Sequence, residues 1–429
     1  MTSSAPSPHS SVRQLVSAVH AGADLPWLDT AGLPGLQVAT PELAAQQQEA
    51  LRARRAVTPP ADAAADLPLA GLPMLVKDLF PIEGVPCSYG SVHLEHLPAA
   101  TSPVVQSLID RGAIVFGTTA TSEMGMTAYT EPVGMPAPDN PIRPGHTPGG
   151  SSGGAAVAVA SGAVAAALAS DGGGSIRVPA AACGVVGFKP AHDTSGGRFA
   201  TDGFITRTVD DAAAMHGFRL PECSAFDMRG VPVGLMTEGL HADVAVQSQW
   251  RTAAVRCADV LSNAGAEIVE VTAPYGPDVF DVFRDLMARR AATLPDAQYS
   301  AVTTWLRESA QAVPPERAAE ALAVLGALPQ RVQRAWPMAM VITPTLAFDP
   351  PPIGHFSSMA PPDDFNAQTQ WTPWNTLWNL TGFASVAVPV RAEHVGAAGA
   401  PPVSVQLGAI SASQPQLLAA AQFVEAHLS

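Results

Sequence analysis

Residues 149–154 read Gly-Gly-Ser-Ser-Gly-Gly, and residues 171–177 read Asp-Gly-Gly-Gly-Ser-Ile-Arg. Three consecutive glycines before Ser175 give a backbone that can adopt positive φ and approach a ligand closely. Such a loop can direct successive N–H groups into one concavity, as an oxyanion hole or an anion nest requires. Ser175 would then be placed as a nucleophile, provided that a base lies nearby. A tight surface turn would explain an isolated Gly-Gly-Gly-Ser as well.

The segments around these two stretches alternate between helix and strand patterns. Short apolar runs bounded by Gly or Pro predict buried strands, and longer runs with apolar residues at helical spacing predict helices. The predicted strands are 72–76, 113–117, 231–236, 267–271, 338–343 and 385–390, and the predicted helices include 243–263, most of 278–335, and 413–428 with Ser413 as its cap. This alternation predicts an α/β fold, with a central mixed β-sheet covered by helices on both faces.

The domain organisation follows from the same pattern. Residues 1–67 are expected to form an N-terminal segment with helices at 10–22 and 40–55, ending in a linker rich in Pro, Ala and Asp at 58–68. This segment is expected to pack on the main domain, residues 68–429. No repeat of 20–50 residues is present, so the whole chain is predicted to be one large structural domain.

Composition excludes several classes of protein. The chain has 429 residues, of which 47% are apolar and only 14% charged, so it can bury a large core. Its net charge of −14 argues against nucleic-acid binding, which requires clustered cations. No stretch is apolar enough to be expected to cross a membrane, and the first residues lack the pattern of a secretory signal. With four cysteines and no Cys-x-x-Cys spacing, we expect a cytoplasmic protein with reduced thiols.

The use of lysine points to a candidate base. Only Lys77 and Lys189 among the 23 basic residues are lysines. An arginine side chain keeps its proton in proteins, whereas a desolvated lysine can lose it. Lys77 follows the predicted strand 72–76, and the apolar residues on either side can desolvate its amine and lower the pKa. Lys77 is therefore a candidate general base.

These motifs together resemble those of the amidase signature hydrolases. The hallmark of that family is a Gly-Gly-Ser-Ser-Gly-Gly run followed by Asp-x-Gly-Gly-Ser-Ile-Arg. The similarity covers roughly residues 68–390 and is most specific over 149–190, with weaker matches at 207–213, 342–345 and 379–382. The resemblance implies the fold of that family, a central mixed sheet in one large domain.

The resemblance also implies a Ser–cis-Ser–Lys triad. In this chain, Ser175 would be the acylated nucleophile, Lys77 the base, and Ser151 the bridging serine after a cis Gly150–Ser151 peptide. We assign Ser151 because it precedes Ser175 by 24 residues, the separation found in the family. Backbone N–H groups of Gly172, Gly173, Gly174 and Ser175 would form the oxyanion hole. The implied supporting residues are Ser152, Asp171 and Arg177, and Lys189 matches a structural position.

Other residues have competing interpretations. His93 and His96 lie three residues apart without a third ligand at a standard spacing, so we expect a surface loop, with neither a metal site nor a cofactor. His146 is the alternative base, in a Ser-His-Asp arrangement. Helical spacing places three tryptophans on one helix face: Trp371, Trp374 and Trp378. This spacing predicts core packing, with the wall of an acyl pocket as the alternative.

The function predicted from the sequence is hydrolysis of a small carboxamide by a stand-alone amidase, with a homodimer as a candidate assembly. One alternative is the glutamine-hydrolysing amidase subunit of a tRNA-dependent amidotransferase, which requires a partner. Another is a non-catalytic, amidase-like binding module, against which the retained lysine and serines argue. Residues 120–123 read Ala-Thr-Ser-Glu where many members have Asn-x-x-Glu, and the segment after Pro190 is shortened. Relatives shape the acyl pocket there, so these differences favour the stand-alone amidase.

Overall fold

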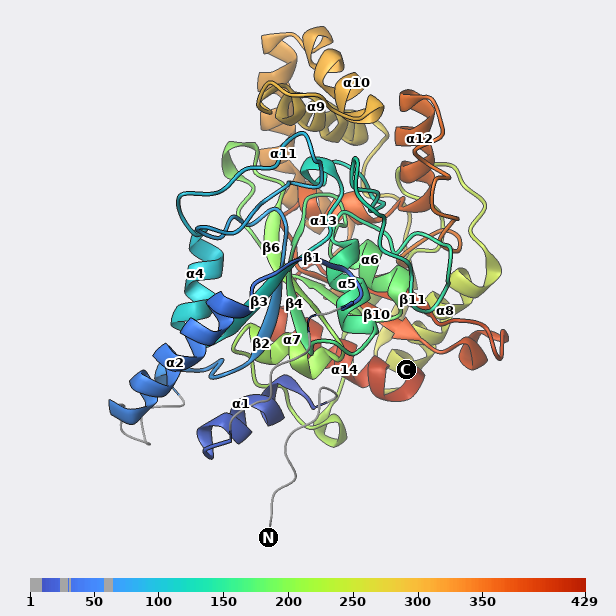
Figure 1. The fold of residues 1–429 in the computed structure, drawn as a ribbon. Coiled ribbons are helices and arrows are strands. Elements are labelled where there is room, and N and C mark those ends of the chain that lie inside the picture. The colour runs from blue at the N-terminus through green and yellow to red at the C-terminus, as the bar shows by residue number, and fades with distance from the viewer. Residues whose placement is uncertain (1–9, 24–29, 31, 58–64) are drawn as a thin grey trace.

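An eleven-stranded mixed sheet organises the part of the chain that the computed structural model describes, residues 10–23, 30, 32–57 and 65–429 (Figure 1). The strand order is β1-β3-β2-β4-β6-β5-β10-β11-β9-β7-β8. The strands are β1 (Leu36–Ala39), β2 (Pro73–Lys77), β3 (Ile114–Thr119), β4 (Ala166–Asp171), β5 (Val186–Lys189), β6 (Thr201–Thr206), β7 (Pro232–Leu235), β8 (Glu267–Glu270), β9 (Met340–Pro344), β10 (Ser385–Val390) and β11 (Val403–Ala409). The predicted α/β class with a central mixed sheet is confirmed.

Parallel pairs lie near both ends of the sheet and antiparallel pairs lie between them. β2 is parallel to β3 and β4, and β7 is parallel to β8 and β9. The strands from β4 through β6, β5, β10 and β11 to β9 pair antiparallel. The carboxyl ends of β2 and β4 therefore meet at one edge, where Lys77 and Asp171 are the last residues of their strands.

Helices cover both faces of the sheet. They are α1 (Val12–His20), α2 (Pro41–Val57), α4 (Pro103–Asp110), α5 (Gly153–Ala160), α6 (Arg177–Cys183), α7 (Val209–Met215), α8 (Ser248–Asn263), α9 (Asp278–Ala292), α10 (Ala301–Ser309), α11 (Pro315–Ala335), α12 (Pro361–Trp371), α13 (Asn375–Leu380) and α14 (Gln414–Leu428). None of the helices in the described ranges is long and apolar enough to cross a membrane.

Alternate residues of β4 show how the two faces are packed. Ala167 and Ala169 belong to a buried cluster with the small residues of α5, whereas Leu168 belongs to another cluster with residues of α4 and α7. This alternation is the normal two-residue period of a strand. The small side chains of β4 and α5 let the helix that follows Ser151 and Ser152 lie against the sheet.

The N-terminal segment contributes a strand that the sequence pattern did not predict. β1 pairs antiparallel with β3, so this segment extends the main sheet by one strand. The helices predicted at 10–22 and 40–55 are confirmed as α1 and α2. Of the predicted linker at 58–68, residues 58–64 lie outside the described residues.

The C-terminal half agrees with the predicted pattern. The helical region 278–335 divides into α9, α10 and α11, which lie together in Figure 1 (orange). Ser413 caps α14 as predicted: its side chain accepts a hydrogen bond from Gln416 N–H, and the Gln416 side chain accepts one from the backbone N–H of Ser413. β4, β5, β6 and β11 were not predicted.

Candidate active site

Lys77 and Ser151 meet at the carboxyl end of β2. The Lys77 side chain is fully buried, and its Nζ donates hydrogen bonds to Oγ of Ser151 (2.6 Å) and to Oγ of Ser170 (3.0 Å). The lysine and the predicted bridging serine are therefore in direct contact. Ser170 was missed by the sequence analysis. It precedes Asp171 at the end of β4, and its position becomes apparent only once β4 is placed beside β2.

The loop before α5 distinguishes the two adjacent serines. The Gly150–Ser151 peptide is cis in the structure, and Ser151 directs its hydroxyl to Lys77. Ser152 instead donates its hydroxyl hydrogen bond to the backbone carbonyl of Ser170, at 3.3 Å. A Cβ on Gly150 would come within 2.5 Å of the Tyr129 backbone, so only glycine fits there. Of the two serines, Ser151 is the one bonded to the lysine.

Burial changes the protonation of Lys77. Desolvation lowers the pKa of its ammonium group from 10.5 to about 7. The nearby charges of Asp171 and Asp202 oppose this shift, and Arg290 adds to it. Close to half of the amine is therefore neutral at pH 7, and a neutral amine can accept a proton.

A buried ion pair holds the glycine loop. The carboxylate of Asp171 accepts hydrogen bonds from Nη2 (2.8 Å) and Nε (3.0 Å) of Arg177, and both side chains are fully buried. Burial alone would raise the pKa of Asp171, but the Arg177 guanidinium and the hydrogen bonds outweigh it, so this pKa lies well below its usual value. The same carboxylate accepts the N–H groups of Gly174 (2.8 Å) and Ile176 (3.0 Å).

The prediction for the oxyanion hole needs one correction. Because the Gly174 N–H donates to Asp171, it is not available to a bound oxyanion. The N–H groups of Gly172, Gly173 and Ser175 have no hydrogen-bond acceptor within the described part of the chain. These three amides remain as candidate donors. Gly174 itself has a φ of +117°, and a Cβ there would lie 2.7 Å from Asn375.

Residues far along the chain complete the support of Arg177. Its guanidinium donates to the Asn379 side chain (2.7 Å), the Gln406 side chain (2.8 Å) and the Asn375 carbonyl (3.0 Å). Asn379 in turn donates to the carbonyl and the carboxylate of Asp171. The match at 379–382 was a signal for Asn379, whereas no local motif pointed to Gln406.

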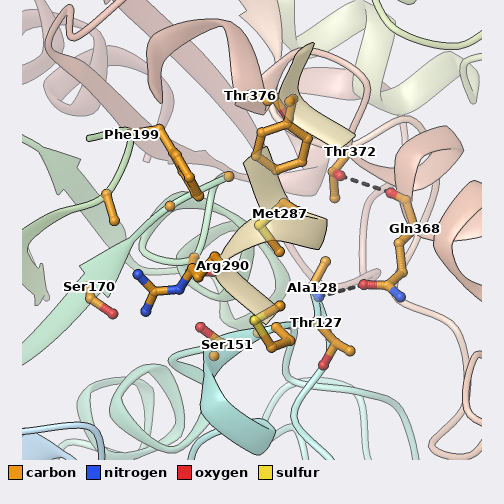
Figure 2. A pocket seen from close by; sticks show the side chains of 18 of the residues that line it. Thr127, Ala128, Ser151, Ser170, Phe199, Met287, Arg290, Gln368, Thr372 and Thr376 are labelled. Atoms are coloured by element: carbon orange, nitrogen blue, oxygen red, sulfur yellow. Dashed lines mark hydrogen bonds between the residues drawn. The ribbon is translucent and has the colours of Figure 1, made fainter. Parts of the chain in front are cut away.

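Ser151 and Ser175 line one cavity of about 100 Å³. Near these serines it is lined by Ser170, Gly172 and Gly173. Its wall is formed largely by the apolar side chains of Leu79, Met124, Met126, Phe199, Phe280, Phe283, Met287 and Phe365. Figure 2 shows the guanidinium of Arg290 on the same side of this cavity as Ser151 and Ser170, with Gln368 on the far side.

The tryptophans pack in the core, as predicted. Trp371, Trp374 and Trp378 are each 0% exposed, and none of them is among the residues that line the described cavity. They do not share one helix, because α12 ends at Trp371 and α13 begins at Asn375. Trp378 packs directly on Gly408, where a Cβ would overlap its ring.

The remaining candidates lie away from the cavity. His146 contacts the Pro144 carbonyl through Nδ1 (3.0 Å) and does not line the described cavity. His96 stacks on Tyr89, and no group of three or more potential metal ligands occurs among the described residues. Lys189 donates to the carbonyls of Pro190 (3.0 Å) and Phe383 (2.8 Å).

Comparison with known sequences places the chain in a family. The Amidase family model matches residues 35–418. The chain is 31% identical over 390 residues to the putative amidase AmiB2 of Mycobacterium tuberculosis (strain ATCC 25618 / H37Rv), covering 85% of this chain and 83% of that protein. It is also 35% identical over 261 residues to a glutamyl-tRNA(Gln) amidotransferase subunit of Rhodopirellula baltica. That match covers 53% of this chain and about half, 51%, of the Rhodopirellula protein.

Solved structures share the fold over almost the whole chain. A 6-aminohexanoate cyclic dimer hydrolase in complex with substrate superposes with a TM-score of 0.80 at 21% identity, covering 99% of this chain and 94% of that one. A crystal structure described as an amidase superposes with a TM-score of 0.74 at 26% identity, covering 99% and 97%. The chain belongs to the amidase family, the amidase signature hydrolases.

Proposed function

We propose that this protein hydrolyses a small carboxamide through an acyl-enzyme on Ser175, with Ser151 as the proton relay and Lys77 as the general base. The hydrogen bond of 2.6 Å from Lys77 Nζ to Oγ of Ser151, which lines the same cavity as Ser175, is the observation that carries this proposal. The lowered pKa of Lys77 supports it, because a base has to be partly neutral at working pH.

Acylation would proceed by two linked proton transfers. Oγ of Ser175 attacks the amide carbonyl carbon and gives its proton to Ser151, whose own proton passes to the neutral amine of Lys77. The carbonyl oxygen becomes an oxyanion, which the amides of Gly172, Gly173 and Ser175 would stabilise. Loss of one such donor typically raises the barrier by ~3–4 kcal/mol.

Collapse of this intermediate breaks the C–N bond. Ser151 returns a proton to the leaving nitrogen and is reprotonated by the ammonium group of Lys77. Water then attacks the ester on Ser175, and the same relay removes the proton from the water and returns one to the Ser175 oxygen. The products are a carboxylic acid and ammonia or an amine, and the enzyme is restored.

A fluorophosphonate probe tests the nucleophile directly. We expect covalent labelling of Ser175, located by mass spectrometry of the digested protein, and loss of labelling in Ser175→Ala. Ser161→Ala is a matched control, because the Ser161 hydroxyl bonds only within the C-terminal turn of α5. Labelling of another residue would overturn the assignment of Ser175, and no labelling of the folded protein would favour a non-catalytic module.

The similarity to an amidotransferase subunit supports a second candidate function, glutamine hydrolysis for a partner. The 120–123 segment favours the first, because Ala120 stands there in place of the Asn of many family members. Hydrolysis of butyramide by the purified chain alone would support a stand-alone amidase. Activity confined to glutamine and dependent on an added partner would support the amidotransferase function.

A further inference from the structure

Arg290 provides the only charged side chain among the described residues that line the cavity. It lies on α9, three residues after Met287 and seven after Phe283, and all three line the cavity. This spacing places them on one face of the helix. Figure 2 shows the guanidinium directed toward the end of the cavity near Ser151 and Ser170.

The guanidinium of Arg290 lacks a counter-ion within the described chain. On the same helix, Asp281 pairs with Arg284 (2.9 Å) and Asp278 pairs with Arg331 (3.8 Å), but no acidic side chain lies on the described wall of the cavity. Desolvation lowers the pKa of Arg290 from its usual value without any opposing carboxylate. A partly desolvated guanidinium without a neighbouring carboxylate is a strong binding site for an anion.

We propose that Arg290 binds a carboxylate on the substrate, so that the site takes a short amide bearing an anionic group. This inference rests on the proposed function of the cavity. Arg290, Ser151 and Ser175 line the same cavity of about 100 Å³, which suits a short spacer between the amide and the carboxylate. Arginine recognises a carboxylate through two parallel N–H···O bonds.

A pair of matched substrates tests this proposal. Succinamate carries a carboxylate in the position where succinamide carries a second, neutral carboxamide. We expect the wild-type kcat/KM for succinamate to exceed that for succinamide at least tenfold. In Arg290→Gln, this ratio should fall to about one, with succinamide hydrolysis within a few-fold of wild type. Arg290→Lys should retain part of the preference.

The measurements are best made at pH 9, well above the Lys77 pKa of about 7, where Arg290 remains charged. Arg289→Gln is the matched control, because Arg289 lies in the same last turn of α9 but does not line the described cavity. The Arg289 variant tests whether a loss of the preference for succinamate merely reflects one cation fewer at the helix end. We expect the Arg289 variant to keep the wild-type ratio, and an equal loss in both variants would overturn the proposal.

Binding of succinate, measured by calorimetry, separates this inference from the proposed function. Succinate should bind wild type and Ser175→Ala at least tenfold more tightly than it binds Arg290→Gln. That result supports the carboxylate site even if no amide is hydrolysed. If succinamide is hydrolysed in a Ser175-dependent way while succinate binds all variants equally, the hydrolase stands and the carboxylate site is refuted.

Discussion

Acidification is expected to inactivate the enzyme through Lys77. With a pKa of about 7, the amine is roughly 90% neutral at pH 8 and roughly 1% neutral at pH 5. Since only the neutral amine can act as a base, kcat/KM should fall ~90-fold between these values, with a limiting slope of one. A lysine with the ordinary pKa of 10.5 would be only ~0.3% neutral at pH 8, so burial supplies most of the available base.

The assay is the pH dependence of kcat/KM for a neutral amide such as butyramide, at constant ionic strength, because this quantity reports the pKa of the free enzyme. Three charged groups act on Lys77: Asp171, Asp202 and Arg290. Asp202→Asn removes a charge that favours the ammonium form, so the midpoint should move to lower pH. Arg290→Gln removes a charge that disfavours it, so the midpoint should move to higher pH. A flat profile from pH 5 to 8, or a midpoint that neither variant moves, would refute Lys77 as the base.

Four further substitutions test the relay and its support. Ser151→Ala should lower kcat/KM at least ~100-fold, the lower range for loss of a positioned proton donor and acceptor. Ser152→Ala should lower kcat/KM no more than about tenfold, because the Ser152 hydroxyl donates to a backbone carbonyl. The reverse order would make Ser152 the relay. Arg177→Met leaves the buried carboxylate of Asp171 without its cation and should lower the free energy of unfolding in urea by about 3–5 kcal/mol, and a loss below about 1 kcal/mol would contradict that reasoning. Lys77→Met should be inactive yet at least as stable as wild type at pH 6: the folded pKa lies below the unfolded one, so Lys77 increasingly destabilises the native state as the pH falls from 10.5 to 7. A markedly lower Tm would argue against this.

The sequence predicted those parts of the fold whose side chains follow a simple period. β2, β3, β9 and β10 are apolar runs of branched or long side chains and were found within a few residues. β4 reads Ala-Ala-Leu-Ala-Ser-Asp, and alanine has a low strand propensity. It forms a strand because small residues fit between β2, β6 and the buried helix α5, a tertiary requirement that no local pattern expresses. β1 has four residues and becomes a strand only by pairing with β3.

In the candidate site, too, local patterns were visible in the sequence and tertiary contacts were not. Local motifs pointed to Lys77, Ser151 and Ser175 as candidates, because glycine loops and a rare lysine are visible in the sequence. Contacts across the fold were not visible. Gln406 reaches Arg177 from 229 residues away, and Ser170 reaches Lys77 only because two strands lie in parallel. The N–H of Gly174 was assigned to the substrate, although the carboxylate of Asp171 is its acceptor.

Two buried cations, Arg177 and Lys77, lie at this edge of the sheet. Their different hydrogen-bond partners explain why one is an arginine and the other a lysine. Arg177 is fully buried against the carboxylate of Asp171, so its permanent charge is compensated and can hold the glycine loop in place. Lys77 is equally buried, but its hydrogen bonds within the described chain go to serine hydroxyls, so desolvation is only partly offset by Asp171 and Asp202 and the pKa falls. A guanidinium at position 77 would remain charged and could not accept a proton. In a chain whose only other lysine is Lys189, the proposed proton relay therefore requires a lysine at position 77.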